Sequence, residues 1–167
     1  KLAHEALGAQ ANFVRNIAAR VPGMFYQAKL RPDGRSEIPF VNDAVRDMLD
    51  LEPEVLRHDD RPLFERVHPD DLPGVKAALA ASARELVPWR QVYRAILPTR
   101  EVRWFSVEAV PQREADGSVV WHGFTTDVTE VQNTNRKLDR QHRMLEAIRQ
   151  AQASYIDAGD RTQVFDR

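Results

Sequence analysis

The chain has 167 residues, of which 43% are hydrophobic and 29% charged, a composition typical of globular proteins and not of disordered ones. Its 24 Lys and Arg residues nearly balance its 25 Asp and Glu residues, so no basic excess points to nucleic acid and no acidic excess points to a basic partner. It contains no cysteine, which excludes disulfides, thiolate metal ligands, cysteine nucleophiles and a flavin attached through sulfur.

The N-terminal part of the chain alternates helical and extended patterns. Residues 1–21 carry an apolar stripe at helical spacing and predict a flanking helix. Residues 24–41 predict a hairpin around the turn-forming sequence PDGR at 32–35. Residues 43–65 predict short helices, because two prolines interrupt the helical spacing there.

A clearer helix is predicted from the Asp70-Asp71 pair to Arg84. Its apolar stripe consists of Leu72, Val75, Ala78 and Leu79, and either aspartate can cap its first turn. The neighbouring His68 is interpreted as part of this helix start and not as a metal ligand, because no second set of ligands stands at metal spacing.

After this helix the hydrophobic period changes to two. Residues 89–97, 102–110 and 119–128 predict three strands rich in β-branched and aromatic residues. An Asp-Gly pair at 116–117 predicts a hairpin between the last two. Strands, then helices, then three consecutive antiparallel strands indicate an α+β fold.

The last long segment, 129–158, predicts a polar helix with a partial heptad pattern. Val131, Leu138 and Leu145 repeat every seven residues, whereas the partner positions Thr134 and Gln141 are polar. We therefore expect a weak coiled-coil seam, and we expect the helix to end at Gly159-Asp160.

Four short motifs in this order resemble the PAS domain, the bacterial sensory box. They are PGMFY at 22–26, FVN at 40–42, VHPDD at 67–71 and the three C-terminal strands that end in DVTE at 127–130. The resemblance covers roughly residues 22–130. Residues 145–152 and the tail that follows resemble the lead-in helix of a GAF domain. We therefore expect a PAS domain at 22–128, a signalling helix at 129–158 and the start of a further domain at 159–167.

The resemblance implies a five-stranded antiparallel sheet with short helices on one face, flanked by N- and C-terminal signalling helices. It implies a sensory module, itself without catalytic activity, that passes a signal to an output domain such as a histidine kinase or diguanylate cyclase. The family also implies a homodimer formed through the flanking helices. The chain begins at Lys1 without a Met, and we expect it to be part of a longer protein.

The sequence predicts neither a membrane segment nor a catalytic site. The longest stretch without charged residues, 117–126, has about ten residues, and a membrane span needs about 20. The absence of cysteine fits a reducing compartment, so we expect a cytoplasmic protein. The seven glycines form no phosphate-binding pattern, and no nucleophile motif accompanies the serines.

The cofactor is unknown at this stage. Haem is disfavoured, because a haem-binding relative would carry an axial histidine on or beside the long helix, and residues 71–84 contain none. The five histidines are scattered singly, and no metal site is predicted. A flavin bound without a covalent link stays open.

Aromatic and hydroxyl side chains on the three strands are the candidates for a ligand pocket. A pocket needs a few converging polar groups among apolar walls. Periodicity alone does not tell which face of the sheet is inside, so the candidates come from both faces. They are Tyr93, Trp104, Ser106, His122 and Thr125.

The DVTE sequence supplies the candidate signal-coupling residues Asp127, Thr129 and Glu130. Asp127 can cap the following helix, and Glu130 can fold back on the cap amide. One interpretation is that this motif only starts a helix. The other is that it couples the sheet to the helix, with Asp127 paired to Arg94 or Arg103 across the strands.

Two function classes remain from the sequence. A sensor of small molecules should contain an enclosed pocket, whereas a ligand-free dimerisation and relay module should have a core filled by side chains.

Overall fold

The computed structural model describes the backbone of residues 22–162 and the side chains of residues 22–153. The helix expected at 1–21 and the chain end at 163–167 lie outside these described residues. The chain divides into two compact units, one up to Val128 and the other from Thr129 onward, and each is described by itself.

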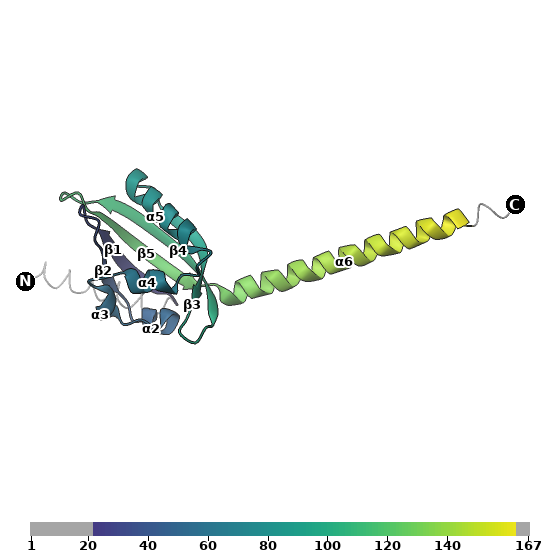
Figure 1. Ribbon diagram of the computed structural model, residues 1–167, viewed down its shortest axis with the longest axis horizontal. Coiled ribbons are helices and arrows are strands. Elements are labelled where there is room, and N and C mark those ends of the chain that lie inside the picture. Colours follow the sequence, from purple (N-terminus) through teal and green to yellow (C-terminus); the bar gives the residue numbers. More distant parts are fainter. Residues whose placement is uncertain (1–21, 163–167) are drawn as a thin grey trace, which may run out of the picture. The chain divides into compact units, whose positions relative to one another are not determined.

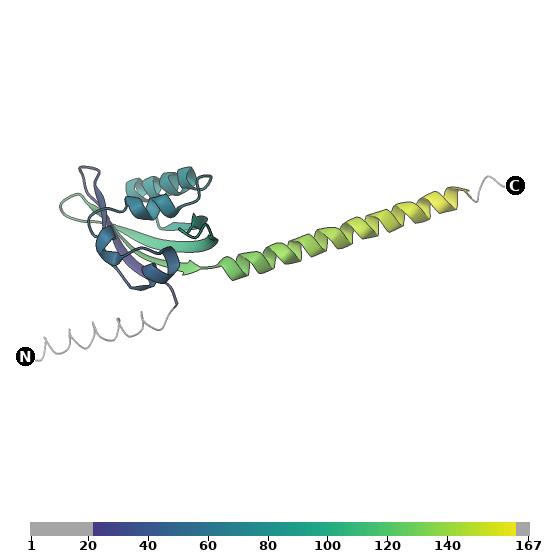
Figure 2. The ribbon, with the colours of Figure 1, turned by 60° about the horizontal axis from the view of Figure 1, so that its bottom comes forward.

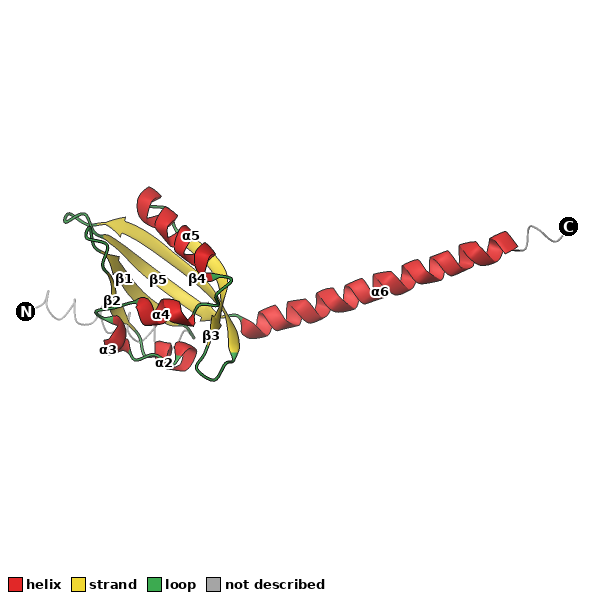
Figure 3. Cartoon of the chain, in the orientation of Figure 1, coloured by secondary structure: helices red, strands yellow, loops and turns green. Residues whose placement is uncertain are grey.

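The first unit contains a five-stranded antiparallel sheet with the strand order β2-β1-β5-β4-β3 (Figures 1 and 3). The first and the last strand of the chain therefore lie side by side at the centre of the sheet. The strands are β1 (Met24–Leu30), β2 (Ser36–Val41), β3 (Trp89–Ile96), β4 (Val102–Arg113) and β5 (Val119–Asp127).

Four helices connect β2 to β3 and cover one face of this sheet (Figures 1 and 2). They are α2 (Ala44–Leu49), α3 (Pro53–Leu56), α4 (Arg61–Arg66) and α5 (Leu72–Glu85). The α+β architecture predicted from the sequence, with short helices on one face of a five-stranded antiparallel sheet, is confirmed.

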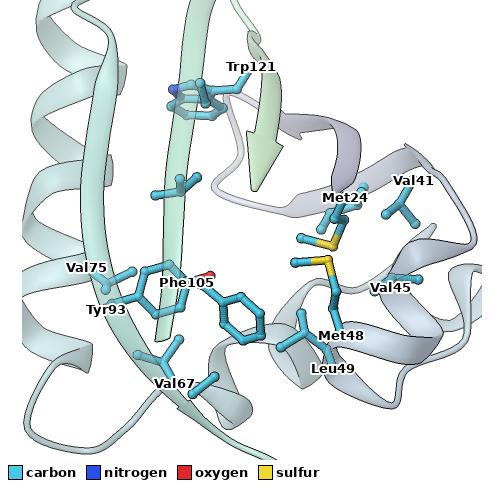
Figure 4. Packing of buried hydrophobic residues seen from close by; sticks show 14 of the residues in the cluster. Met24, Val41, Val45, Met48, Leu49, Val67, Val75, Tyr93, Phe105 and Trp121 are labelled. Atoms are coloured by element: carbon cyan, nitrogen blue, oxygen red, sulfur yellow. The ribbon is translucent and has the colours of Figure 1, made fainter. Parts of the chain in front are cut away.

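The core lies between the helices and the inner face of the sheet. Along β4 the side chains of Phe105, Val107 and Ala109 are buried. Glu108, which lies between two of them, and Val110, which follows the last, are exposed. This alternation follows from the two-residue period of a strand. Figure 4 shows Phe105 at the centre of the packing, among side chains of the sheet and of α2.

The turn between β3 and β4 forms without the glycine that such a turn favours. Arg100 adopts a φ of 66°, and the turn closes with a hydrogen bond of 2.9 Å from the Leu97 amide to the Glu101 carbonyl. A non-glycine residue in the left-handed region is uncommon, so the strand pairing on both sides must hold this turn.

Helix α5 is attached to the sheet at its N-terminal end by an ion pair. The carboxylate of Asp71 accepts hydrogen bonds from the Arg94 amide (2.8 Å) and from its guanidinium Nε (3.0 Å) and Nη2 (2.6 Å). Asp71 occupies the N-cap position of α5, as the sequence predicted for one of the two aspartates. It makes no side-chain capping bond there, because Arg94 of β3 takes its oxygens instead.

At its C-terminal end α5 is attached through a buried hydroxyl. The indole Nε1 of Trp121 on β5 donates to Ser82 Oγ (2.9 Å), and this hydroxyl donates to the Val87 carbonyl (2.6 Å). The helix then ends at Leu86 in the left-handed conformation, with a φ of 54°. Both ends of α5 are therefore linked to strands of the sheet by polar contacts.

The second unit is the helix α6 (Thr129–Thr162). It continues through Gly159 and Asp160, where the sequence predicted its end. Several large apolar side chains on this helix are exposed, among them Val131, Leu138 and Leu145. No helix among the described residues is both long enough and apolar enough to cross a membrane.

We predict that Asp71→Asn destabilises the fold in a pH-dependent way. Loss of the charged acceptor for Arg94 should lower the free energy of unfolding by about 1–2 kcal/mol at neutral pH. Arg94 lowers the pKa of Asp71 in the folded protein below its ordinary value of 3.8. The stabilisation is therefore fully present above that value and is lost as the pH falls through the folded pKa. Denaturant unfolding of both proteins from neutral to acidic pH measures this.

Asp70→Asn is the matched control. Asp70 is 74% exposed and lies 3.6 Å from Arg94 Nη2, so its substitution should cost less than about 0.5 kcal/mol. Equal losses for the two variants would contradict the role given to Asp71.

Candidate functional site

A cavity of about 290 Å³ lies between the inner face of the sheet and helices α4 and α5. Its walls are mainly apolar. Small side chains leave this space open, because Ala80 and Ala83 on α5 and Ala28 on β1 face it and do not reach across. Larger apolar residues that line it include Ile38, Phe64, Leu79, Trp89, Val107 and Trp121.

The floor of the cavity is formed in part by the ring of Tyr26. Tyr26 on β1 pairs in register with Gly123 on β5. A Cβ placed on Gly123 would lie 2.2 Å from Cζ and 2.5 Å from the hydroxyl oxygen of Tyr26. The phenol ring therefore lies against the backbone of Gly123, in space that only glycine leaves free.

Three hydroxyl groups gather at this floor, and we call Tyr26, Tyr93 and Thr125 the hydroxyl corner. All three residues line the cavity. Burial raises the pKa of both tyrosines well above the ordinary value of 10.0, so the phenols stay protonated. The nearby Tyr93 raises the pKa of Tyr26 further, and the Thr125 hydroxyl adjoins the Tyr26 phenol.

The hydroxyl corner is not fully hydrogen-bonded. Thr125 Oγ1 is buried and has no hydrogen bond of good geometry, even though it adjoins the phenol of Tyr26. The Tyr93 phenol also lines the cavity, and it makes no hydrogen bond to another side chain within residues 22–153. Buried hydroxyls nearly always have a partner, so these groups point to a polar occupant, either water or a ligand atom.

Charged groups lie at the edges of the cavity. Lys29 pairs with Glu114 at 2.6 Å, and Lys76 on α5 is exposed. Asp60, which precedes α4, is 9% exposed, and burial raises the pKa of its carboxyl, opposed by a contact to the Ser36 hydroxyl. Lys29 is on β1 and Asp60 contacts Ser36 of β2, so these two charges border the cavity on the side of β1 and β2, whereas Lys76 is on α5.

The structure brings only two of the five predicted pocket residues to the cavity. Tyr93 and Thr125 line it, whereas Trp104, Ser106 and His122 do not. The reason is strand parity, since Trp104 and Ser106 alternate with the buried residues of β4, and His122 is an exposed residue of β5.

Trp104, Ser106 and His122 lie on the outer face of the sheet, away from the cavity. The Arg94 guanidinium lies over the Trp104 ring at 5.7 Å from its centroid, and Ser106 pairs in register with Thr126. Sequence reasoning missed Tyr26, Trp89 and Trp121. These residues can be identified only when the inner face of the sheet is known, because alternate residues of a strand point to the same face.

The predicted coupling residues lie where β5 ends and α6 begins. Asp127 is the last residue of β5, and its Oδ2 lies 3.9 Å from Arg103 Nη1. Arg103 also pairs with Glu101 at 3.0 Å and donates to the Asp47 carbonyl of α2 at 3.1 Å. Two arginines were expected as partners of Asp127. Arg103 lies near Asp127, whereas Arg94 pairs with Asp71. A coupling role for Asp127, Thr129 and Glu130 stays a proposal.

A family model described as the PAS fold matches residues 38–125. This is more than half of the chain and includes the cavity-lining residues of α4, α5 and β3 to β5. The chain belongs to the PAS family.

Solved PAS structures share this fold. A sensory box histidine kinase/response regulator from Burkholderia thailandensis is 20% identical, with a TM-score of 0.57, over 74% of this chain and 91% of that chain. The N-terminal domain of a diguanylate cyclase with a PAS/PAC sensor from Marinobacter aquaeolei is 16% identical, with a TM-score of 0.55, over 65% of this chain and 98% of that one. No curated protein matches the sequence.

We predict that Gly123→Ala displaces the Tyr26 ring into the cavity. The added methyl group overlaps the end of the phenol, so the ring must swing away from β5, at a cost of about 1–3 kcal/mol in stability. Thermal unfolding and a crystal structure of the variant measure both effects.

Gly74→Ala provides the control for this substitution. A Cβ on Gly74 in α5 would meet its nearest atom, Gln91 Nε2, at 3.7 Å, which is ordinary contact. Since alanine favours a helix over glycine by up to about 1 kcal/mol, this variant should be at least as stable as the parent. An unmoved Tyr26 in Gly123→Ala would refute the packing described above.

Proposed function

We propose that this PAS domain binds a small molecule in the cavity beneath α5 and transmits the binding event through β5 to α6 and an output domain of the full-length protein. The observation that carries the proposal is the unfilled cavity. Protein interiors are close-packed, and a module that only relayed a signal would fill this space with side chains. A volume of about 290 Å³ is near the lower end of the range for small-molecule sites.

Chain continuity supports the transmission route. Trp121 and Thr125 of β5 line the cavity, and the same strand ends at Asp127, two residues before the first residue of α6. A ligand that contacts β5 therefore acts on the strand that leads directly into the helix. Arg103 ties the end of this strand to α2, so movement at Asp127 would be felt on the helical side of the domain as well.

The pattern of α6 supports an output through helix pairing. Its exposed residues Val131, Leu138 and Leu145 repeat at the heptad spacing of a coiled coil, so a second copy of the chain is the proposed partner. Polar Thr134 and Gln141 weaken this seam and keep two registers close in energy, which suits a switch. The PAS domains of histidine kinases and diguanylate cyclases with the same fold make either enzyme the proposed output.

Native mass spectrometry and absorption spectroscopy of the purified protein test ligand binding. We expect a bound small molecule, and a visible absorption band would identify it as a flavin or another chromophore. Ala83→Leu should abolish the extra mass, because the larger side chain projects from α5 into the cavity. Ala77→Leu, on the exposed face of the same helix, should retain it. Protein that carries no ligand and gains no stability from any candidate molecule would favour the ligand-free relay function.

The helix-pairing step predicts the effect of a stronger seam. Replacing Thr134 and Gln141 together by Leu should tighten dimerisation at least tenfold in analytical ultracentrifugation and should lock the output of the full-length protein in one state. Leucines at Asn133 and Arg140, outside the seam, serve as the control and should leave dimerisation unchanged. An output that still responds normally in the Thr134 and Gln141 variant would contradict the proposed mechanism.

A further inference from the structure

We infer that the ligand is an uncharged, mainly hydrocarbon molecule of about ten non-hydrogen atoms that carries one hydrogen-bond acceptor, such as a carbonyl oxygen, directed at the hydroxyl corner. This inference rests on the proposed function, and it assigns the chemical class of the ligand.

The acceptor is inferred from the donors that the cavity offers. Tyr93 is 3% exposed and its phenol faces the cavity without a hydrogen-bond partner among the described side chains. Because burial raises its pKa, the phenol keeps its proton and acts as a donor across the physiological range. Thr125 and Tyr26 add two neutral hydroxyls beside it. A carbonyl oxygen has two lone pairs and can accept from such donors at once.

The absence of charge on the ligand follows from where the charged side chains lie. The cations that line the cavity are Lys29, which pairs with Glu114, and Lys76, which is exposed, so a carboxylate buried at the hydroxyl corner would lack a buried, unpaired counter-charge. A cationic head would lack its counter-charge there too, because Asp60 is the buried carboxyl of this cavity and contacts Ser36 on β2. Ser36 pairs with Leu30, four residues along β1 from Tyr26, and β2 and the β3 strand of Tyr93 are opposite edges of the sheet.

The size of the ligand follows from the volume of the cavity. A water molecule takes about 30 Å³ of liquid volume, so 290 Å³ accommodates about ten groups of that size. Haem and flavin nucleotides are far larger than this. The mainly apolar walls favour a hydrocarbon body, since apolar atoms there gain burial and lose no hydrogen bonds to water.

A set of three matched probes tests the class: 2-nonanone, octanoate and nonylamine. They are similar in length and differ in the head group, which is a neutral acceptor, an anion or a cation. Their affinities for the 167-residue chain are measured by tryptophan fluorescence, since Trp89 and Trp121 line the cavity, and by thermal stabilisation. We expect 2-nonanone to bind at least tenfold more tightly than either charged probe.

Tyr93→Phe separates ligand recognition from a structural role. Removal of a phenol oxygen without a partner should leave the melting temperature of the free protein unchanged or raised, while 2-nonanone binds about fivefold more weakly. Ser118→Ala is the control, because Ser118 Oγ is also buried without a partner but does not line the cavity. This variant should bind 2-nonanone as the parent does.

The outcomes also distinguish this inference from the proposed function. Tighter binding of octanoate or nonylamine, or equal binding of 2-nonanone by Tyr93→Phe and the parent, would overturn the ligand class and leave ligand binding intact. If no probe binds but the purified protein carries a molecule that Ala83→Leu excludes, the ligand class again fails alone. If no probe binds and no molecule is carried, both fail.

Discussion

Helix α5 is attached to the sheet at both of its ends and lines a cavity along part of its length, and the rest of the site depends on this arrangement. Asp71 binds Arg94 of β3 at one end, and Ser82 accepts a hydrogen bond from Trp121 of β5 at the other. Near the second of these contacts the helix lines the cavity with Ala80 and Ala83. Two directional contacts hold the helix at a distance that alanine side chains cannot fill, so an apolar cavity remains where close packing would otherwise be expected.

The same cavity owes its floor to a pair of residues on neighbouring strands. Gly123 lets the ring of Tyr26 lie against the backbone of β5, which keeps the ring out of the space below α5. This packing also brings the Tyr26 phenol to Thr125 and near Tyr93, and it thereby collects three hydroxyls in an otherwise apolar enclosure. Charge is kept at the border, where Lys29 and Asp60 have partners of their own. This arrangement supports the proposed preference of the cavity for a neutral acceptor over an ion.

The proposed signalling route runs through the central strand, β5. Because β5 lies between β1 and β4, it contacts both halves of the sheet, and its residues line the cavity before the chain enters α6. The helix carries its apolar residues exposed and at heptad spacing, with polar residues interrupting the seam. A relay module without a ligand would need only the exposed heptad residues of α6 and no cavity. The combination of an open cavity and a helix with exposed apolar residues at heptad spacing is what favours the proposed ligand-controlled switch.

The sequence by itself determined the elements, the fold family and the heptad spacing of α6, because hydrophobic period, turn residues and motif order are local properties of the chain. It did not determine which strand residues face the cavity. Trp104, Ser106 and His122 have side chains suited to a ligand pocket, but they alternate with the residues that face inward. Which face of the sheet is the inner one is decided only when α5 packs on it. Two further features depended on tertiary structure. The ring of Tyr26 needs Gly123, about a hundred residues away, and the strand register places these two residues together. Asp71 binds Arg94 and makes no capping hydrogen bond in its own helix, because the packing of α5 on the sheet places Arg94 beside it.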